Sequence, residues 1–433
     1  MIITPLDINS SAGEQAIKKL LNRFQSSDEA VMTSVSKILA DVRTGGDAAV
    51  IEYTKKFDAP EMKQPLAVSS EELEQSYNLV DMSFLESLEV AIDRIHSFHE
   101  REMEDSWLQT RENGTIVGRL VRPVDSAGLY VPGGQGGSTP LVSSVLMNGI
   151  PAGIAGVAHR VMMTPPAENG TINPHLLVAA QEIGITEIYR AGSAWAIAAL
   201  AYGTESIPAV DVIVGPGNQY VAEAKRQVSG MVRIDMIAGP SEVLIVADET
   251  ADPVHIAADM LAQAEHDPQA LAVVITTDVS HQDKILSELE SQLSGLSREQ
   301  IARQSLTARG QIFVSPSLEE AVDLANEIAI EHLELMIADP WSQVPQVRHA
   351  GAIFLGRHTP EAAGDYLAGP NHVLPTMGTA RFASALGVET FLKKSSVISY
   401  SAGALEEDAD HIRALACLEG LTAHAASVTR RLA

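Results

Sequence analysis

Cysteine, aromatic residues and positive charge are all scarce in this chain. Its 433 residues include one cysteine, Cys417, so an intrachain disulfide and a cysteine-based zinc finger are both excluded. A single thiol is typical of the reducing cytosol, and we expect a cytoplasmic protein. With 30 Lys and Arg against 56 Asp and Glu, the net charge of −26 repels phosphate backbones, so we expect no nucleic-acid partner.

Long uninterrupted apolar runs are also missing. The most apolar long window, Val142–Met163, is broken by polar residues and a proline, which indicates a core segment and not a membrane span. The N-terminus, Met-Ile-Ile-Thr-Pro-Leu-Asp, lacks the basic-then-apolar order of a signal peptide. We therefore expect no membrane contact. The interrupting residues are Asn148, Pro151, His159 and Arg160.

The abundant residues, Ala, Val, Ile and Leu, are typical of helices packed on parallel sheets. Apolar residues make up 45% of the chain, and its length favours two large domains. Strands and helices alternate from Gly128, and a second alternating series begins after a break at Ala238–Ser241. We therefore expect an α/β fold with two Rossmann-like parallel-sheet domains and small helical segments at both ends of the chain. The predicted strands are 128–131, part of 155–164, 187–191, 210–214, 243–247, 271–276, 311–314 and 352–355, and the predicted helices are 176–183, 194–202, 222–228, 253–265, 280–293 and 318–328.

Outside the two alternating series the pattern is mainly helical. Residues 10–60 have helical apolar stripes, and Arg43–Asp47 stops one helix and caps the next. Residues 70–112 are helical and highly charged. After Pro375 the pattern is irregular, and a helix is expected from about 409 to 432.

Two glycine-rich turns follow predicted strands. Gly133–Gly137 and Gly215–Asn218 could each present backbone N–H groups to a phosphate. Neither has the G-x-G-x-x-G spacing of a dinucleotide-binding loop, because a third glycine is missing. Tight turns after strands fit both patterns as well.

Gln263 and His266 are the most informative pair in the chain. They lie three residues apart at the end of a predicted helix that Pro268 stops, so they share one helix face. A neutral imidazole is a common zinc ligand, and the amide oxygen could face the same target. Two ligands do not make a metal site, and the spacing also fits a polar helix end with a capping histidine.

Three further groups could carry chemistry. Glu331 and His332 are an adjacent acid and imidazole just past a predicted helix, suited to stepwise proton transfers or to a surface pair. Asp365 follows a glycine and could reach a metal or a cationic substrate, or stand in a turn. Glu419 and His424 are five residues apart, a spacing that does not stack them on one helix face.

Together these signals are specific, because the chain resembles histidinol dehydrogenase from about residue 30 to its end. So many separated motifs in one order argue against chance similarity. The matching segments are Arg43–Asp47, Gly128–Gly134, Val214–Asn218, Asp235–Glu242, Gln263–His266, Glu331–Glu334, Gly364–Tyr366, Gly369–Pro375 and Glu419–His424.

The resemblance implies a zinc-containing, NAD-dependent enzyme that oxidises L-histidinol through the aldehyde to L-histidine, the last steps of histidine biosynthesis. It also implies two NAD⁺ per turnover, one Zn²⁺ per subunit, and a homodimer whose sites are completed by Glu419 and His424 from the partner chain. The implied zinc ligands are Gln263, His266, Asp365 and His424; the acid/base pair is Glu331 and His332; the substrate contacts are Ser241, Gln263, His266, His332, Asp365, Glu419 and His424; and the cofactor contacts are Tyr130, Trp195 and Asn218.

We expect four parts in the chain. Residues 1–27 form an N-terminal helical segment. Residues 28–127 join 239–378 in a first α/β domain that carries the zinc and catalytic residues. Residues 128–238 form a second, NAD-binding α/β domain, and residues 379–433 form a C-terminal segment that contacts the partner subunit.

Two positions depart from the family pattern, and both bear on how the cofactor is held. Trp195 stands where the family often carries a Gln that touches NAD, although an indole could stack on a ring. The loop 135–140 is richer in glycine than the pattern. A relative that oxidises another alcohol, a zinc hydrolase in which Glu331 activates water, and a non-catalytic scaffold remain alternatives.

The expected mechanism has two oxidations with a water addition between them. His332 removes the alcohol proton, Glu331 activates the water that attacks the aldehyde, and His332 accepts the proton of the hydrate. Zinc orients the substrate through its amino and imidazole nitrogens. Cys417 matches no catalytic motif, so a covalent thiohemiacetal is not expected.

Overall fold

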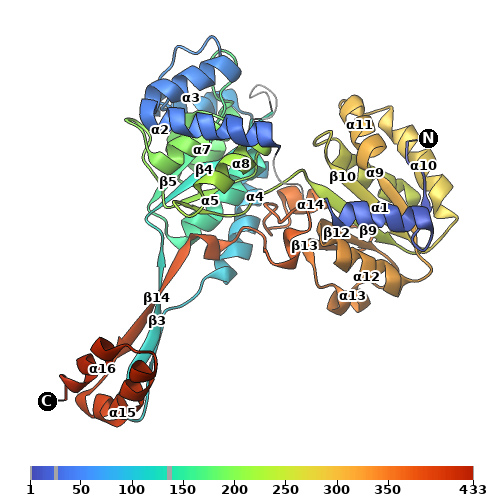
Figure 1. Cartoon of the computed structure of the whole chain (residues 1–433). Coiled ribbons are helices and arrows are strands. Elements are labelled where there is room, and N and C mark those ends of the chain that lie inside the picture. Colours follow the sequence, from blue (N-terminus) through green and yellow to red (C-terminus); the bar gives the residue numbers. More distant parts are fainter. Residues whose placement is uncertain (1, 24–27, 134–138, 433) are drawn as a thin grey trace.

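The chain folds into two α/β bodies and a projecting arm (Figure 1). The computed structural model describes residues 2–23, 28–133 and 139–432. Within these ranges three sheets are present: two parallel sheets of six and five strands, and one antiparallel sheet of three. No helix in the described ranges combines the length and apolar character needed to cross a membrane. The expected fold class is confirmed.

The six-stranded sheet lies between two layers of helices. One layer holds α9 to α11 and the other holds α1 and α12, and apolar side chains of the central strands point alternately into each layer. All six strands run parallel. Their order is β1 (Leu6–Asp7), β11 (Gln311–Val314), β10 (Leu271–Thr276), β9 (Glu242–Ala247), β12 (Ile330–Met336) and β13 (Ala350–Leu355), and the helices are α1 (Ser11–Leu21), α9 (Pro253–Ala264), α10 (His281–Leu293), α11 (Glu299–Arg309), α12 (Leu318–Ile328), α13 (Pro340–Gln343) and α14 (Glu361–Tyr366).

The five-stranded sheet is also covered on both faces. Helices α3 to α6 pack on one face, and α2, α7 and α8 pack on the other. The strand order is β6 (Glu187–Arg190), β5 (His159–Thr164), β4 (Ser126–Tyr130), β7 (Val212–Val214) and β8 (Arg233–Ile234), and the helices are α2 (Glu29–Phe57), α3 (Ser70–Ser76), α4 (Met82–His99), α5 (Val142–Ala155), α6 (Pro174–Glu182), α7 (Ser193–Tyr202) and α8 (Gln219–Val228).

The prediction for residues 28–127 differs from this packing. We expected them to join residues 239–378, but α2 packs on α7 and α8, and α4 packs on α5. Their apolar stripes therefore cover the five-stranded sheet, whose strands lie in residues 126–234. An amphipathic stripe shows that a helix face is buried, but it does not show which sheet covers it.

Helix α2 contains the break that the sequence predicted at Arg43–Asp47. Gly46 has φ 54° and ψ −139°, a conformation essentially restricted to glycine. The N–H of Asp47 donates to the Glu205 carboxylate at 2.7 Å, and a Cβ built on Gly46 would lie 2.2 Å from the same carboxylate. The glycine therefore allows the helix to turn tightly against a capping acid.

The arm carries the C-terminal residues away from both bodies (Figure 1). Its antiparallel sheet has the order β14 (Leu392–Ser399), β3 (Ile116–Pro123) and β2 (Trp107–Thr110), and its helices are α15 (Ala402–Leu418) and α16 (Thr422–Thr429). The prediction of an irregular segment between Pro375 and a helix at 409 is correct up to Phe391 and wrong beyond it, since β14 and the start of α15 occupy the rest. Most β14 side chains are exposed, so they show no buried apolar face.

Candidate active site

The predicted acid/base pair lies in β12, an inner strand of the six-stranded sheet between β9 and the edge strand β13. Glu331 and His332 are the second and third residues of β12, and they are 5% and 4% exposed. His332 pairs with Val243 of β9. Both residues follow α12, which ends at Ile328, as predicted, but the alternative of a surface pair is wrong, because all seven residues of β12 are buried despite three ionisable side chains.

The main chain of Glu242 holds both members of the pair. Its N–H donates to the Glu331 carboxylate at 2.7 Å, and its carbonyl oxygen lies 3.1 Å from Nδ1 of His332. A carbonyl only accepts, so Nδ1 of His332 carries the hydrogen. The other ring nitrogen, Nε2, is therefore left with its lone pair and is the basic atom of the pair.

Burial shifts the pKa values of the two groups in opposite directions. It lowers the pKa of His332 to about 4, so the imidazole is neutral at neutral pH. It raises the pKa of Glu331 well above its usual value, against the effect of the Glu242 N–H, and the nearby charges of Glu242 and Asp365 raise it further. A neutral imidazole beside a carboxyl with a raised pKa is suited to proton transfer near neutral pH.

A group of possible metal ligands lies beside this pair. One ligand atom from each of His266, Glu361 and Asp365 lies within 4.8 Å of the others. His266 follows the end of α9, while Glu361 and Asp365 belong to the short helix α14. Nitrogen and oxygen donors converging in this way are suited to a zinc ion.

Gln263 is fully buried at the end of α9, with Glu361 as its partner. With its amide turned so that Nε2 faces Glu361, Gln263 donates to both carboxylate oxygens, at 2.9 and 3.0 Å. The same orientation leaves the amide oxygen free to bind a cation. No sequence motif singled out Glu361, because its role depends on a partner that is distant in the chain.

Other predicted substrate contacts are divided between the body and the arm. Ser241 directly precedes β9, one residue before the Glu242 main chain. Glu419 ends α15 and His424 lies in α16, and both are exposed on the arm. One chain therefore brings Gln263, His266, Asp365 and the acid/base pair together around Glu361, with Ser241 next to Glu242 in sequence. The two arm residues belong to α15 and α16, which lie away from the six-stranded sheet (Figure 1).

The predicted cofactor contacts lie at the five-stranded sheet. Tyr130 ends β4 and its hydroxyl accepts from the N–H of Ser193, while Asn218 caps α8 just after β7. The parallel strands β4 and β7 are neighbours at the topological switch point of the sheet, where the chain moves from one half of the strand order to the other. Open α/β sheets bind ligands at this point. Residues 134–138 of the glycine-rich loop lie outside the described residues.

Trp195 has a different environment from the one its predicted role requires. The indole is 3% exposed, and its N–H donates to Thr54 at 3.1 Å. Its ring centroid lies 5.8 Å from that of Tyr53 and 5.6 Å from that of Phe57. The ring thus stacks on aromatic side chains of α2, in contrast to the predicted contact with a bound cofactor.

Comparisons with known proteins identify the family of the chain. The family model described as histidinol dehydrogenase matches residues 21–432. A histidinol dehydrogenase of Desulfotalea psychrophila is 71% identical over 100% of both chains, and one of Oleidesulfovibrio alaskensis is 51% identical over 99% of both. The crystal structure of histidinol dehydrogenase from Elizabethkingia anophelis superposes with a TM-score of 0.92 at 38% identity, covering 100% of this chain and 98% of that one. The chain therefore belongs to the histidinol dehydrogenase family of oxidoreductases.

Proposed function

We propose that this enzyme oxidises L-histidinol to L-histidine in two dehydrogenations at one site, with one zinc ion per subunit and two NAD⁺ per turnover. The family supplies the reaction. The observation that carries the assignment of residues is the Glu242 main chain, which holds Glu331 and His332 next to the ligand group. A site at which acid, base and metal ligands converge is a candidate for metal-assisted proton transfer.

The residues fit both groups that the reaction requires. Gln263, His266 and Asp365 offer an amide oxygen, an imidazole and a carboxylate for zinc, and His424 of the partner subunit would be the fourth ligand. Tyr130 and Asn218 would contact the nucleotide at the switch point of the five-stranded sheet. Each of two successive NAD⁺ molecules would accept one hydride, and zinc would fix the substrate's nitrogen atoms.

The acid/base pair handles the protons in order. Nε2 of His332 removes the hydroxyl proton of the alcohol and releases it to solvent after the aldehyde forms. Glu331, as the carboxylate, takes a proton from the water that adds to the aldehyde carbon. His332 then removes a hydroxyl proton from the hydrate, and the carboxylate of the product results.

The arm supports a homodimer with shared sites. The buried side chains of α15 and α16 are small, being Ala404, Ala409, Ala416, Ala425 and Val428, while Leu415, Leu418 and Leu421 are 63%, 84% and 42% exposed. A leucine-rich surface around a core this small requires a covering surface. Docking on a second copy would bury these leucines and bring Glu419 and His424 to the partner's ligand group.

The test is to count NADH. Zinc-loaded protein receives limiting L-histidinol and excess NAD⁺, and we expect two NADH and one L-histidine per histidinol. One NADH with release of the aldehyde would contradict the role of Glu331 in water addition. No NADH would reject histidinol as the substrate and favour another alcohol or a zinc hydrolase, which a substrate panel separates.

A further inference from the structure

The carboxylate of Glu242 is held by groups outside the catalytic pair. It is 1% exposed and receives Nε of Arg23 at 2.6 Å on one oxygen and a terminal nitrogen of Arg23 at 2.8 Å on the other. The N–H of Met377 donates to it at 3.1 Å. Two parallel bonds to a planar guanidinium fix the orientation of a carboxylate more strongly than one contact does.

Arg23 is itself held in place by main-chain groups. It follows helix α1, is 8% exposed, and donates to the carbonyl oxygens of Leu20 at 3.1 Å and Ala329 at 3.5 Å. Ala329 directly precedes β12. The guanidinium therefore joins the amino end of β12 to that of β9, the two strands that carry the catalytic pair and its Glu242 support.

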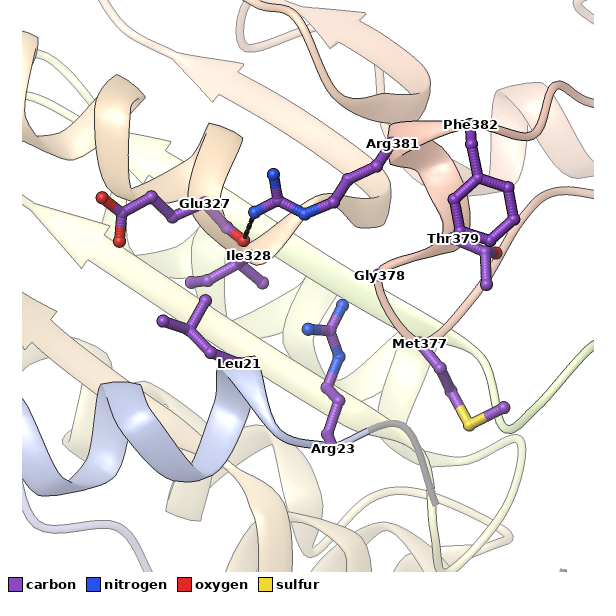
Figure 2. A pocket seen from close by; sticks show the side chains of 9 residues that line it. All are labelled: Leu21, Arg23, Glu327, Ile328, Met377, Gly378, Thr379, Arg381 and Phe382. Carbon is purple, nitrogen blue, oxygen red and sulfur yellow. Dashed lines mark hydrogen bonds between the residues drawn. The ribbon is translucent and has the colours of Figure 1, made fainter. Parts of the chain in front are cut away.

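A cavity of about 640 Å³ opens over this guanidinium (Figure 2). Arg381 lies across it and donates to the carbonyl oxygen of Glu327. The two arginines thus share a cavity, but only Arg23 bonds to Glu242. This difference makes Arg381 a matched control for the loss of a positive charge from the same surface.

We propose that Arg23 is a positioning residue for catalysis, acting through Glu242. By fixing the carboxylate, it fixes the two peptide groups of Glu242, whose N–H and carbonyl orient Glu331 and His332. Without Arg23, the carboxylate would be a buried and uncompensated charge, and the local main chain would move to solvate it. The inference rests on the catalytic roles proposed for Glu331 and His332.

The same contacts could have a purely structural role in anchoring α1. Such a role predicts that loss of Arg23 lowers the amount of folded enzyme and scales kcat equally at every pH. A positioning role predicts a change in the chemistry of the enzyme that remains folded. The two differ in the pH profile, because the Glu242 N–H lowers the pKa of Glu331.

The experiment compares Arg23→Met, Arg23→Lys and Arg381→Met at saturating NAD⁺, with folding followed by thermal melting and zinc by elemental analysis. For Arg23→Met we expect kcat to fall about 10- to 100-fold with little change in KM for histidinol, as for other small misplacements of catalytic groups. The acid limb of its pH profile should move to higher pH. Arg23→Lys should recover part of the rate, and Arg381→Met should match the parent.

The shift in the acid limb has a definite sign. Glu331 faces Glu242 of β9, His332 of its own strand and Asp365 of α14. Loss of the N–H bond and an unneutralised Glu242 both raise the pKa of Glu331, so more alkaline conditions are needed to ionise it. An unshifted limb and an unchanged kcat in folded Arg23→Met would overturn the inference.

A paired variant covers the case in which Arg23→Met does not fold. Arg23→Met/Glu242→Met removes both charges, and apolar replacement of a buried ion pair is often neutral for stability. We expect the same loss in kcat, while full activity would overturn the inference. Glu331→Gln and His332→Asn test the proposed function separately. If these two variants remain active, the proposed function is wrong. If they are inactive but the Arg23 variants remain active, only the positioning role of Arg23 is wrong.

Discussion

The carboxyl group of Asp58 should make this protein less stable as the pH rises. Asp58 ends α2, and its Oδ2 is buried without a hydrogen-bond partner among the described residues. A Cβ built on Gly192 would lie 2.8 Å from that oxygen, so α7 begins directly against it. Burial raises the pKa of Asp58 to about 7 from 3.8, and we expect Asp58→Asn to remove the resulting pH dependence.

The sign follows from proton linkage. The folded protein keeps the Asp58 proton up to about pH 7, whereas the unfolded chain releases it near pH 3.8. The contribution of this proton to the free energy of unfolding is therefore complete below pH 3.8 and decreases progressively as the pH rises from 3.8 to about 7. Each pKa unit corresponds to about 1.4 kcal/mol. Between pH 5.5 and 7 the Asp58→Asn variant should therefore gain about 2 kcal/mol relative to the parent.

Urea unfolding of both proteins at half-unit steps from pH 5.5 to 8 measures this gain. The difference in free energy of unfolding should rise until about pH 7 and then level off. Asp105→Asn, at an exposed position, removes the same charge and controls for the change in net charge. A difference between Asp58→Asn and the parent that is constant over this range would refute the reasoning.

Three further predictions concern the dimer, the ligand group and the fold. Inactive Glu331→Gln and His424→Ala enzymes, refolded together in equal amounts, should recover about a quarter of the parent activity. Half of the dimers are then hybrids, and one of the two sites in each hybrid combines an intact Glu331 with an intact His424 of the partner subunit. No recovery would contradict shared sites. Glu361→Leu removes the acceptor of the Gln263 amide and should weaken zinc binding about 10- to 100-fold in a chelator competition, whereas unchanged affinity would show that the amide needs no support. Gly46→Ala should lower the free energy of unfolding by about 1–3 kcal/mol in urea titrations, and a neutral effect would mean that α2 relaxes away from its strained turn.

Strands with unbroken apolar sequences were predictable to the residue. The predicted strands 271–276 and 311–314 coincide with β10 and β11. Parallel strands covered on both faces need such runs, and the short length of these two runs favours a strand over a buried helix. The helix expected at 253–265 ends one residue earlier, at Ala264, and so still places Gln263 at its end.

Strand β12 was not predicted from the sequence, because its functional ionisable residues interrupt the apolar pattern of a buried strand. Glu331, His332 and Glu334 interrupt its apolar pattern, and buried ionisable residues cost free energy unless partners hold them. Those partners are the Glu242 main chain and the N–H of Glu361, which come from other elements. Local pattern cannot show such pairing, whereas the resemblance to a family identified the same residues by their motif.

The electrostatics of the site provide an independent reason to expect a bound cation. Burial raises the pKa values of Glu331, Glu334 and Glu361 well above their usual values, and Asp259 shares a hydrogen bond with Glu334. Arg23, which bonds to the neighbouring Glu242, is committed to that carboxylate. These acids can ionise together only if further positive charge enters. A zinc ion would supply that charge at the ligand group. In the free enzyme these buried acids lower the stability of the fold. In the enzyme with metal and substrate bound, the same acids favour binding, so their placement suits the occupied site.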